Sequence, residues 1–253
     1  MLLKAIILSA GQGRRLLPLT QRTPKCALDV AGQSALEWQL GQIAQTAIDE
    51  VVVMTGFQAP VVEAIVSRFH GVPVRTIHNP FYAACDNLGT CWLARPEMDR
   101  DFVIMNGDTL FEAAVLHRLL DAPPTHGITL CIDRKASYDD DDMKVVETQG
   151  TLRRVGKQLP GEPVNAESIG LMSFRHAGPQ LFSDQLDRMM RDESSLKRWY
   201  LSAIDGLAPS QQVGVCSIEG LSWCEVDDAA DLAHAATVVR TWPTAPRAAG
   251  DAM

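Results

Sequence analysis

The sequence has no apolar run long enough to cross a membrane. Its first apolar stretch, residues 5–8, is far shorter than the roughly 20 residues that a spanning helix needs. Glycines and a pair of arginines follow it directly, which is unlike the end of a signal peptide. We therefore expect neither a signal peptide nor an anchor, and no membrane partner.

Positive charge is also scarce. The chain carries 23 Lys and Arg against 31 Asp and Glu, for a formal net charge of -8. Because binding nucleic acid over a broad surface needs an excess of basic residues, we expect no nucleic-acid partner. A small anion can still be bound by a few local cations.

Several signatures of metal and covalent chemistry are missing as well. The six cysteines form no C-x-x-C pair, the six histidines show no metal-ligand spacing, and no G-x-S-x-G motif occurs. The cysteines fall mostly in apolar stretches, which favours buried, reduced thiols in a cytoplasmic protein. We expect neither disulfides nor covalent catalysis.

The chain does contain a regular alternation of short apolar runs and helix-like segments. Strands are predicted at residues 3–8, 50–54, 74–78 and 102–105, with helices at 34–47, 61–69 and 88–94 between them. Later apolar runs are separated by turns, which indicates antiparallel pairing. We expect an α/β fold with a Rossmann-like mixed, mostly parallel sheet flanked by helices and a small antiparallel extension. One domain is expected over residues 1–240, followed by a disordered tail at 241–253.

In open α/β sheets, ligands bind at the carboxyl ends of the strands, and a chemistry-bearing loop follows the first strand here. Gly11 and Gly13 let the backbone approach an anion, and Arg15 and Lys25 can donate to phosphate oxygens. This composition suits a nucleoside triphosphate. The loop lacks the G-K-[ST] ending of a Walker A loop and the third glycine of a Rossmann fingerprint.

The pattern G-x-G-x-R-L-x-P-L-T at residues 11–20, followed by P-K at 24–25, resembles a known signature. It is that of the nucleotidyltransferases that join a nucleoside monophosphate to a sugar phosphate or alcohol phosphate. The resemblance implies the nucleotide-diphospho-sugar transferase type of fold. It also implies that Arg15 contacts the departing pyrophosphate and Lys25 the reacting phosphates, as the catalytic pair. The loop that would wrap the triphosphate consists of Ser9, Ala10, Gly11, Gln12 and Gly13.

The same resemblance extends to two carboxylates. Asp108 matches the family's metal-binding aspartate, and Asp227 matches a second carboxylate before the final helix. With triphosphate oxygens they would hold Mg²⁺ by hard oxygen ligands, which makes Mg²⁺ the expected cofactor and Asp108 part of the nucleotide site. Taken alone, Asp227 is a candidate helix cap, and Asp228 competes for that position.

Residues 79–90 resemble one subgroup of this family. They are similar to the N-P-x-Y…N-N-x-x-S segment of phosphocholine cytidylyltransferases and their phosphonate-using relatives, although Asp86 replaces the first of two asparagines. Asn87 and Thr90 are then the expected base readers, because an amide and a hydroxyl can satisfy the edge of cytosine. A helix cap at Asp86 or Asn87 is the competing interpretation.

Three residues are assigned to the acceptor by the same resemblance. Lys144 follows an acidic stretch at 139–142, and Lys157 and Glu167 match the family's acceptor-side lysine and the strand that lines the acceptor pocket. The acidic stretch lies either near a cationic head group of the acceptor or in a solvated loop. A hairpin lysine in solvent is the alternative for Lys157.

These residues predict a CTP-dependent cytidylyltransferase that transfers CMP to a small phosphate or phosphonate acceptor and releases pyrophosphate. The expected acceptor is phosphocholine, an aminoalkyl phosphonate or another phosphonate or phosphate. A sugar-1-phosphate nucleotidyltransferase that uses UTP, dTTP or GTP is one alternative enzyme. A glycosyltransferase on a related sheet is another, but it would carry an Asp-x-Asp metal motif after a strand, whereas here the strand ends in a single Asp108. A nucleotide-sensing regulatory protein is the alternative without catalysis. The expected partners are therefore CTP and the acceptor, and a homo-oligomer stays open.

Overall fold

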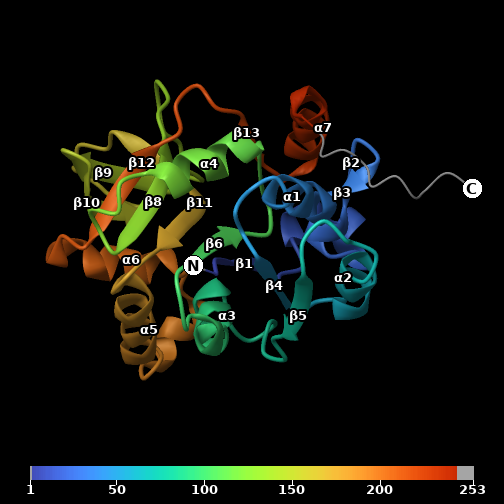
Figure 1. Cartoon of the computed structure of the whole chain (residues 1–253), viewed down its shortest axis with the longest axis horizontal. Coiled ribbons are helices and arrows are strands. Elements are labelled where there is room, and N and C mark those ends of the chain that lie inside the picture. Colours follow the sequence, from blue (N-terminus) through green and yellow to red (C-terminus); the bar gives the residue numbers. More distant parts are fainter. Residues whose placement is uncertain (1, 244–253) are drawn as a thin grey trace, which may run out of the picture.

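The computed structural model describes residues 2–243, and a twisted sheet runs through the middle of that part of the chain (Figure 1). The strands of this sheet are β1 (Lys4–Ser9), β4 (Glu50–Thr55), β5 (Val74–His78), β6 (Phe102–Asn106), β8 (Ile128–Asp133), β9 (Lys144–Thr148), β10 (Thr151–Gly156), β11 (Ala166–Phe174) and β12 (Val213–Ser217). Within the described residues these nine strands follow the order β5-β4-β1-β6-β11-β8-β12-β10-β9.

The sheet is parallel at one side and mostly antiparallel at the other. Strands β5, β4, β1 and β6 pair in parallel, as expected when helices connect successive strands. Strand β11 pairs antiparallel with both β6 and β8, and β9 and β10 form a hairpin. The antiparallel extension predicted from the sequence is thus a direct continuation of the same sheet.

Two small two-stranded sheets accompany the large one. They are β2 (Asp29–Val30) with β3 (Gln33–Ser34), and β7 (Thr109–Phe111) with β13 (Trp223–Glu225). Neither pair was expected from the sequence, because each strand is too short to show an alternating pattern. The second pair matters for the site, since it joins the segment after β6 to the late part of the chain.

Helices cover both faces of the large sheet (Figure 1). They are α1 (Ala35–Ile43), α2 (Ala59–Val66), α3 (Asn87–Leu93), α4 (Ala113–Asp121), α5 (Gly178–Met189), α6 (Leu201–Leu207) and α7 (Ala229–Val238). Helix α1 begins with a capping box in which Ser34 and Glu37 satisfy each other's backbone N–H groups. Among residues 2–243, no helix is long and apolar enough to cross a membrane.

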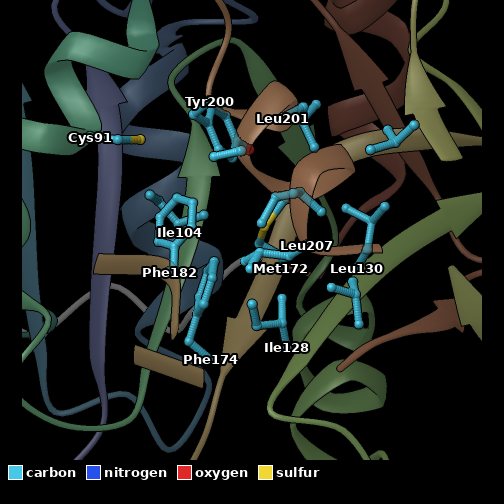
Figure 2. Close-up of a cluster of buried hydrophobic side chains, with 14 of the residues drawn as sticks. Cys91, Ile104, Ile128, Leu130, Met172, Phe174, Phe182, Tyr200, Leu201 and Leu207 are labelled. Carbon is cyan, nitrogen blue, oxygen red and sulfur yellow. The ribbon is translucent and has the colours of Figure 1, made fainter. Parts of the chain in front are cut away.

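The side chains of alternate residues in a central strand pack into two different hydrophobic cores, one on each face of the sheet. In β1, Ile6 packs with α3, α5 and α6, whereas Ala5 and Ile7 pack with α1, α2 and α4. Figure 2 shows part of the core that contains Ile6, where Phe174 and Phe182 lie close together. Their ring centroids are 4.7 Å apart. Because side chains alternate across a strand, burial on both faces explains the nearly continuous apolar runs in the sequence.

The packed part of the chain continues beyond residue 240, so the predicted start of the tail was too early. Trp242 is 5% exposed, and its ring lies edge-on to Trp38 at 6.3 Å between centroids. Its indole N–H donates to Ser222 Oγ at 2.8 Å. The rest of the predicted tail, from residue 244, lies outside the described residues.

Candidate active site

A cavity of about 740 Å³ opens at the carboxyl ends of β1 and β6. Every residue that the sequence assigned to the nucleotide or to the metal lines this cavity, although some are more than 200 positions apart. They are Ser9, Ala10, Gly11, Gln12, Gly13, Arg15, Lys25, Asn87, Thr90, Asp108 and Asp227. The structure therefore brings together the whole nucleotide side of the predicted site.

Two glycines allow the loops of this cavity to approach each other. Gly13 has a φ of +76°, and a Cβ atom there would lie 2.9 Å from Lys25 Cβ. A Cβ atom on Gly107 would lie 2.3 Å from Ser9 Oγ and 2.7 Å from the carbonyl oxygen of Leu8. The absence of a side chain at these positions lets β1, β6 and the lysine pack at close range.

Lys25 joins the two predicted metal ligands. Its Nζ lies 2.7 Å from Asp108 Oδ2 and 2.5 Å from Asp227 Oδ1, and the lysine side chain is only 14% exposed. Arg15 binds the other oxygen of Asp227, with Nη2 to Oδ2 at 2.8 Å. Two cations and two carboxylates thus form one connected ion-pair cluster in the lining of the cavity.

The late carboxylate reaches the cavity through a backbone pairing. Glu225 of β13 is in register with Thr109 of β7, and Val226 N–H donates to the carbonyl oxygen of Asp108 at 3.1 Å. Asp228 then caps α7 by accepting from the N–H groups of the helix's first turn. Because Asp228 supplies the cap, Asp227 is left to face Lys25, which resolves the competition between these two residues.

The cluster changes the ionisation of its carboxyl groups. Burial opposes ionisation of Asp227, but the charges of Lys25 and Arg15 outweigh it and hold the pKa of this carboxyl below its ordinary value. Glu225 has the opposite shift: burial, reinforced by the charges of Asp108 and Asp227, raises its pKa to about 8. Glu225 is a member of this acidic group that sequence reasoning left without a role.

The donor set fits a hard divalent cation. Asp108 Oδ1 is buried and has no hydrogen-bond partner among the described residues, while its other oxygen contacts Lys25. A buried carboxylate oxygen without a partner is costly unless something binds it. Asp108 and Asp227 would supply carboxylate oxygens, which Mg²⁺ prefers, and triphosphate oxygens would complete the ligands.

The two expected base readers lie on α3 in different environments. Asn87 Oδ1 accepts from the backbone N–H of Tyr200 at 2.8 Å, so that its Nδ2 is the end of the amide left to bind a ligand. Thr90 is 4% exposed, and its hydroxyl accepts from Asn79 Nδ2 at 3.0 Å. Asp86 is the N-cap of the helix, as the competing interpretation proposed.

Sequence reasoning missed one side of the cavity. The 3-10 helix η5 (Glu193–Lys197) and the residues after it place Lys197 and Trp199 in the lining. Backbone hydrogen bonds join this segment to the start of α3, with Asp86 N–H donating to Leu196 O at 2.6 Å. No motif marks the segment; the signal in the sequence was an aromatic pair, Trp199 and Tyr200, directly after two basic residues.

The three predicted acceptor residues lie outside the lining of the cavity, at different distances from it. Lys157 is the nearest, since its Nζ lies 4.8 Å from the ring centroid of Trp199 and 3.3 Å from Asp141 Oδ1. Asp141 also contacts Arg15 at 3.2 Å, which connects the acidic loop to the ion-pair cluster. Lys144 instead donates to the carbonyl oxygens of Asp139 and Lys157, so its ammonium group stabilises the loop.

Glu167 is held in a second ion-pair group. Lys135 Nζ lies 3.0 Å from Glu167 Oε2 and 2.6 Å from Asp142 Oδ1. Burial raises the pKa of Glu167 to about 7, with the charge of Asp142 adding to burial and Lys135 opposing it. Within the acidic loop, Asp142 and Asp139 accept from backbone N–H groups of the loop itself. Asp141 is thus the loop carboxylate that faces the site cations.

Comparison with known proteins shows the family to which the chain is similar. Residues 5–181 match the model of a family described as the MobA-like NTP transferase domain. The CMP-5'-(3-aminopropyl)phosphonate synthase of Streptomyces rubellomurinus is 28% identical over 240 residues, which cover 92% of this chain and 38% of that protein. The CTP:phosphoglutamine cytidylyltransferase of Campylobacter jejuni is 23% identical over 252 residues, covering 91% of this chain and 98% of the relative.

The fold is also shared with solved structures. The inositol-1-phosphate CTP transferase from T. maritima has a TM-score of 0.79 to this chain at 16% identity, covering 94% of this chain and 96% of that one. This likeness confirms the expected α/β fold. The chain spans well under half of the length of the Streptomyces relative and nearly the full length of the Campylobacter one.

Proposed function

Because the chain belongs to the MobA-like NTP transferase family, we propose that it transfers CMP from CTP to a small phosphate or phosphonate acceptor. The observation that carries the proposal is the cluster in which Lys25 joins Asp108 and Asp227 beside the glycine loop. Cations, glycine backbone and paired carboxylates in one cavity suit a triphosphate and a divalent metal.

The reaction needs positioning and charge neutralisation more than proton transfer. An oxygen of the acceptor phosphate or phosphonate attacks the α-phosphorus of CTP, and the bond to the β-phosphate breaks to release pyrophosphate. The attacking oxygen is already ionised at neutral pH, so no general base is required. Arg15 and Lys25 would move from the carboxylates to the phosphate oxygens and stabilise the charge on the departing pyrophosphate. When bound by Asp108 and Asp227, Mg²⁺ would neutralise phosphate charge that otherwise repels the anionic acceptor.

Cytosine is the proposed base. The Nδ2 group of Asn87 can donate to the carbonyl oxygen or ring nitrogen of cytosine, since the Tyr200 backbone holds the other end of the amide. Both relatives named above act on cytidine nucleotides according to their names. A sugar-1-phosphate nucleotidyltransferase would use the same cations and carboxylates with another base, which makes base preference the deciding property.

The acceptor is proposed to approach from the side of Trp199. Lys157 lies above that ring and would contact the acceptor phosphate or phosphonate, while Asp141 carries the negative charge that suits a cationic head group. An aminoalkyl phosphonate or phosphocholine has this combination of an anionic end and a cationic end. We propose that Glu167, which pairs with Lys135, also attracts the cationic end of the acceptor.

Pyrophosphate release in the presence of Mg²⁺ tests the proposal. CTP, UTP, dTTP, ATP and GTP would each be combined with phosphocholine, 2-aminoethylphosphonate, 3-aminopropylphosphonate and a panel of sugar 1-phosphates. We expect release with CTP and a non-sugar acceptor. Release with a sugar 1-phosphate and another nucleotide would replace the cytidylyltransferase by the sugar enzyme, and no release with any pair would favour a nucleotide-sensing protein.

A pair of variants shows whether the observed release belongs to this site. Asp108→Asn removes a charge from the proposed metal ligands and should abolish release. Asp121→Asn makes the same chemical change at the exposed end of α4, outside the cavity, and should leave release unchanged. Equal activity of the two variants would place the reaction elsewhere.

A further inference from the structure

Lys25 occupies the position at which the two proposed metal ligands converge. One nitrogen atom lies within 2.7 Å of Asp108 Oδ2 and 2.5 Å of Asp227 Oδ1. A cation bound to both oxygens would have to sit nearly where Nζ now sits, because Mg²⁺ lies about 2.0–2.1 Å from its carboxylate ligands. Pairing with Lys25 and binding of a metal by these same two oxygens, Asp108 Oδ2 and Asp227 Oδ1, therefore exclude each other.

We propose that Lys25 is a displaceable stand-in for the metal: it holds the two carboxylates together, and the metal gains them only when a triphosphate draws the lysine away. This inference rests on the proposed function, since it assumes that the cavity takes a nucleoside triphosphate. It assigns Lys25 a role before the chemical step, in addition to its contact with phosphate, and it makes binding of nucleotide and metal interdependent.

The charge of the cluster supports this order of events. Arg15 and Lys25 contribute two positive charges, and Asp108 and Asp227 contribute two negative charges, so the four residues are neutral together. A divalent cation that enters a neutral group of this kind gains little Coulomb energy and meets two nearby cations. A triphosphate brings several negative charges, which attract the lysine, the arginine and the metal at the same time.

Lys25 packs against the loop that would wrap the triphosphate. The stem of the lysine rests against Gly13, whose missing Cβ leaves the space, and Gly13 belongs to the loop that would wrap the triphosphate. The ammonium group can thus rotate toward a phosphate while the stem stays in place. Arg15 is half-exposed and can leave Asp227 without exposing a buried surface.

Binding of Mn²⁺ without nucleotide, measured by the loss of the free-ion signal in electron paramagnetic resonance, tests the inference directly. We expect Lys25→Met to bind Mn²⁺ at least about tenfold more tightly than the wild type, a size typical of coupling between sites. Lys25→Arg, which keeps the charge, should bind Mn²⁺ as weakly as the wild type. Lys197→Met is the matched control: Lys197 lines the same cavity and forms no ion pair among residues 2–243, and we expect little change there.

A second titration uses a non-hydrolysable CTP analogue. In the wild type the analogue should strengthen Mn²⁺ binding, and in Lys25→Met this gain should be smaller, because the lysine no longer has to be displaced. An unchanged or weaker affinity of Lys25→Met for Mn²⁺ without nucleotide would overturn the inference. An increase in Mn²⁺ affinity in Lys197→Met as large as that in Lys25→Met would also overturn it. Circular dichroism of each variant separates loss of the fold from loss of metal binding.

The two proposals fail in different ways. If no pair of nucleotide and acceptor releases pyrophosphate but Lys25→Met binds Mn²⁺ more tightly, the catalytic proposal is wrong and the stand-in role of Lys25 holds. If CTP turns over but the variant shows no gain in Mn²⁺ affinity, the enzyme is as proposed and Lys25 does not compete with the metal.

Discussion

The side-chain carbonyl of Asn87 accepts a hydrogen bond from the backbone N–H of Tyr200 at 2.8 Å, across 113 positions of sequence. Tyr200 is itself fully buried, and its hydroxyl donates to the carbonyl oxygen of Gly170 at 3.3 Å. The amide of Asn87 is therefore oriented by the core and not by a ligand. Its free end is a donor, which suits a base that presents acceptors.

Replacing Asn87 by Asp tests this orientation. The carboxylate keeps an oxygen for the Tyr200 N–H, so the fold should be retained, but the donor toward the base is lost. We expect kcat/KM for CTP to fall about tenfold or more, the usual result of leaving a buried polar contact unmade. Steady-state kinetics with varied CTP, beside a thermal melt, would measure both effects. Unchanged kcat/KM would contradict the assignment of Asn87 to the base.

Removing the guanidinium group of Arg15 should slow the reaction. Arg15→Ala loses the cation that we propose to contact the departing pyrophosphate, and we expect kcat to drop on the order of 100-fold, as when one preorganised charge-stabilising group is lost. Arg22→Ala is the control, since Arg22 is exposed, does not line the cavity and forms no ion pair within residues 2–243. Near-normal kcat in Arg15→Ala would refute its role.

Two neighbouring glycines should respond differently to alanine. Gly13 has a positive φ and no space for a Cβ beside Lys25, whereas a Cβ on Gly11 would meet nothing within 4 Å. Gly13→Ala should lower the free energy of unfolding by about 1–3 kcal/mol, and Gly11→Ala should leave it nearly unchanged. Urea unfolding of the two variants measures the difference. Equal losses in the two variants would contradict the special restriction at Gly13.

The raised pKa of Glu167 predicts a pH dependence of stability. Burial moves its pKa from 4.5 to about 7. Between these values the folded protein binds a proton that the unfolded chain releases, so stability falls as pH rises from 4.5 to 7 and then levels off. Relative to Glu167→Gln, the wild type should lose up to about 3 kcal/mol over this window. Urea unfolding at several pH values measures this loss. A difference in the free energy of unfolding between wild type and Glu167→Gln that does not change with pH would contradict the raised pKa of Glu167.

Much of the fold could be predicted from the sequence because its signals are local. Apolar runs and helical spacing indicated the strands and helices around β1, and turn residues marked the antiparallel part. The short strands β7 and β13 could not be predicted, since three residues show no period and their pairing joins segments more than 100 positions apart. The burial of Trp242 could not be predicted either, because it depends on contacts with Trp38 and Ser222.

By itself, the sequence predicted the glycine loop, Arg15 and Lys25 as one candidate site, because these residues lie within 20 positions and carry their own spacing. Tertiary structure alone decided that Asp227, not Asp228, faces Lys25, that the amide of Asn87 points its donor outward, and that Lys144 supports a loop while Lys157 faces Trp199. Each of these outcomes depends on which partner reaches a side chain across the fold. A local pattern can name the chemical groups, but their partners are set only when distant strands and loops pack together.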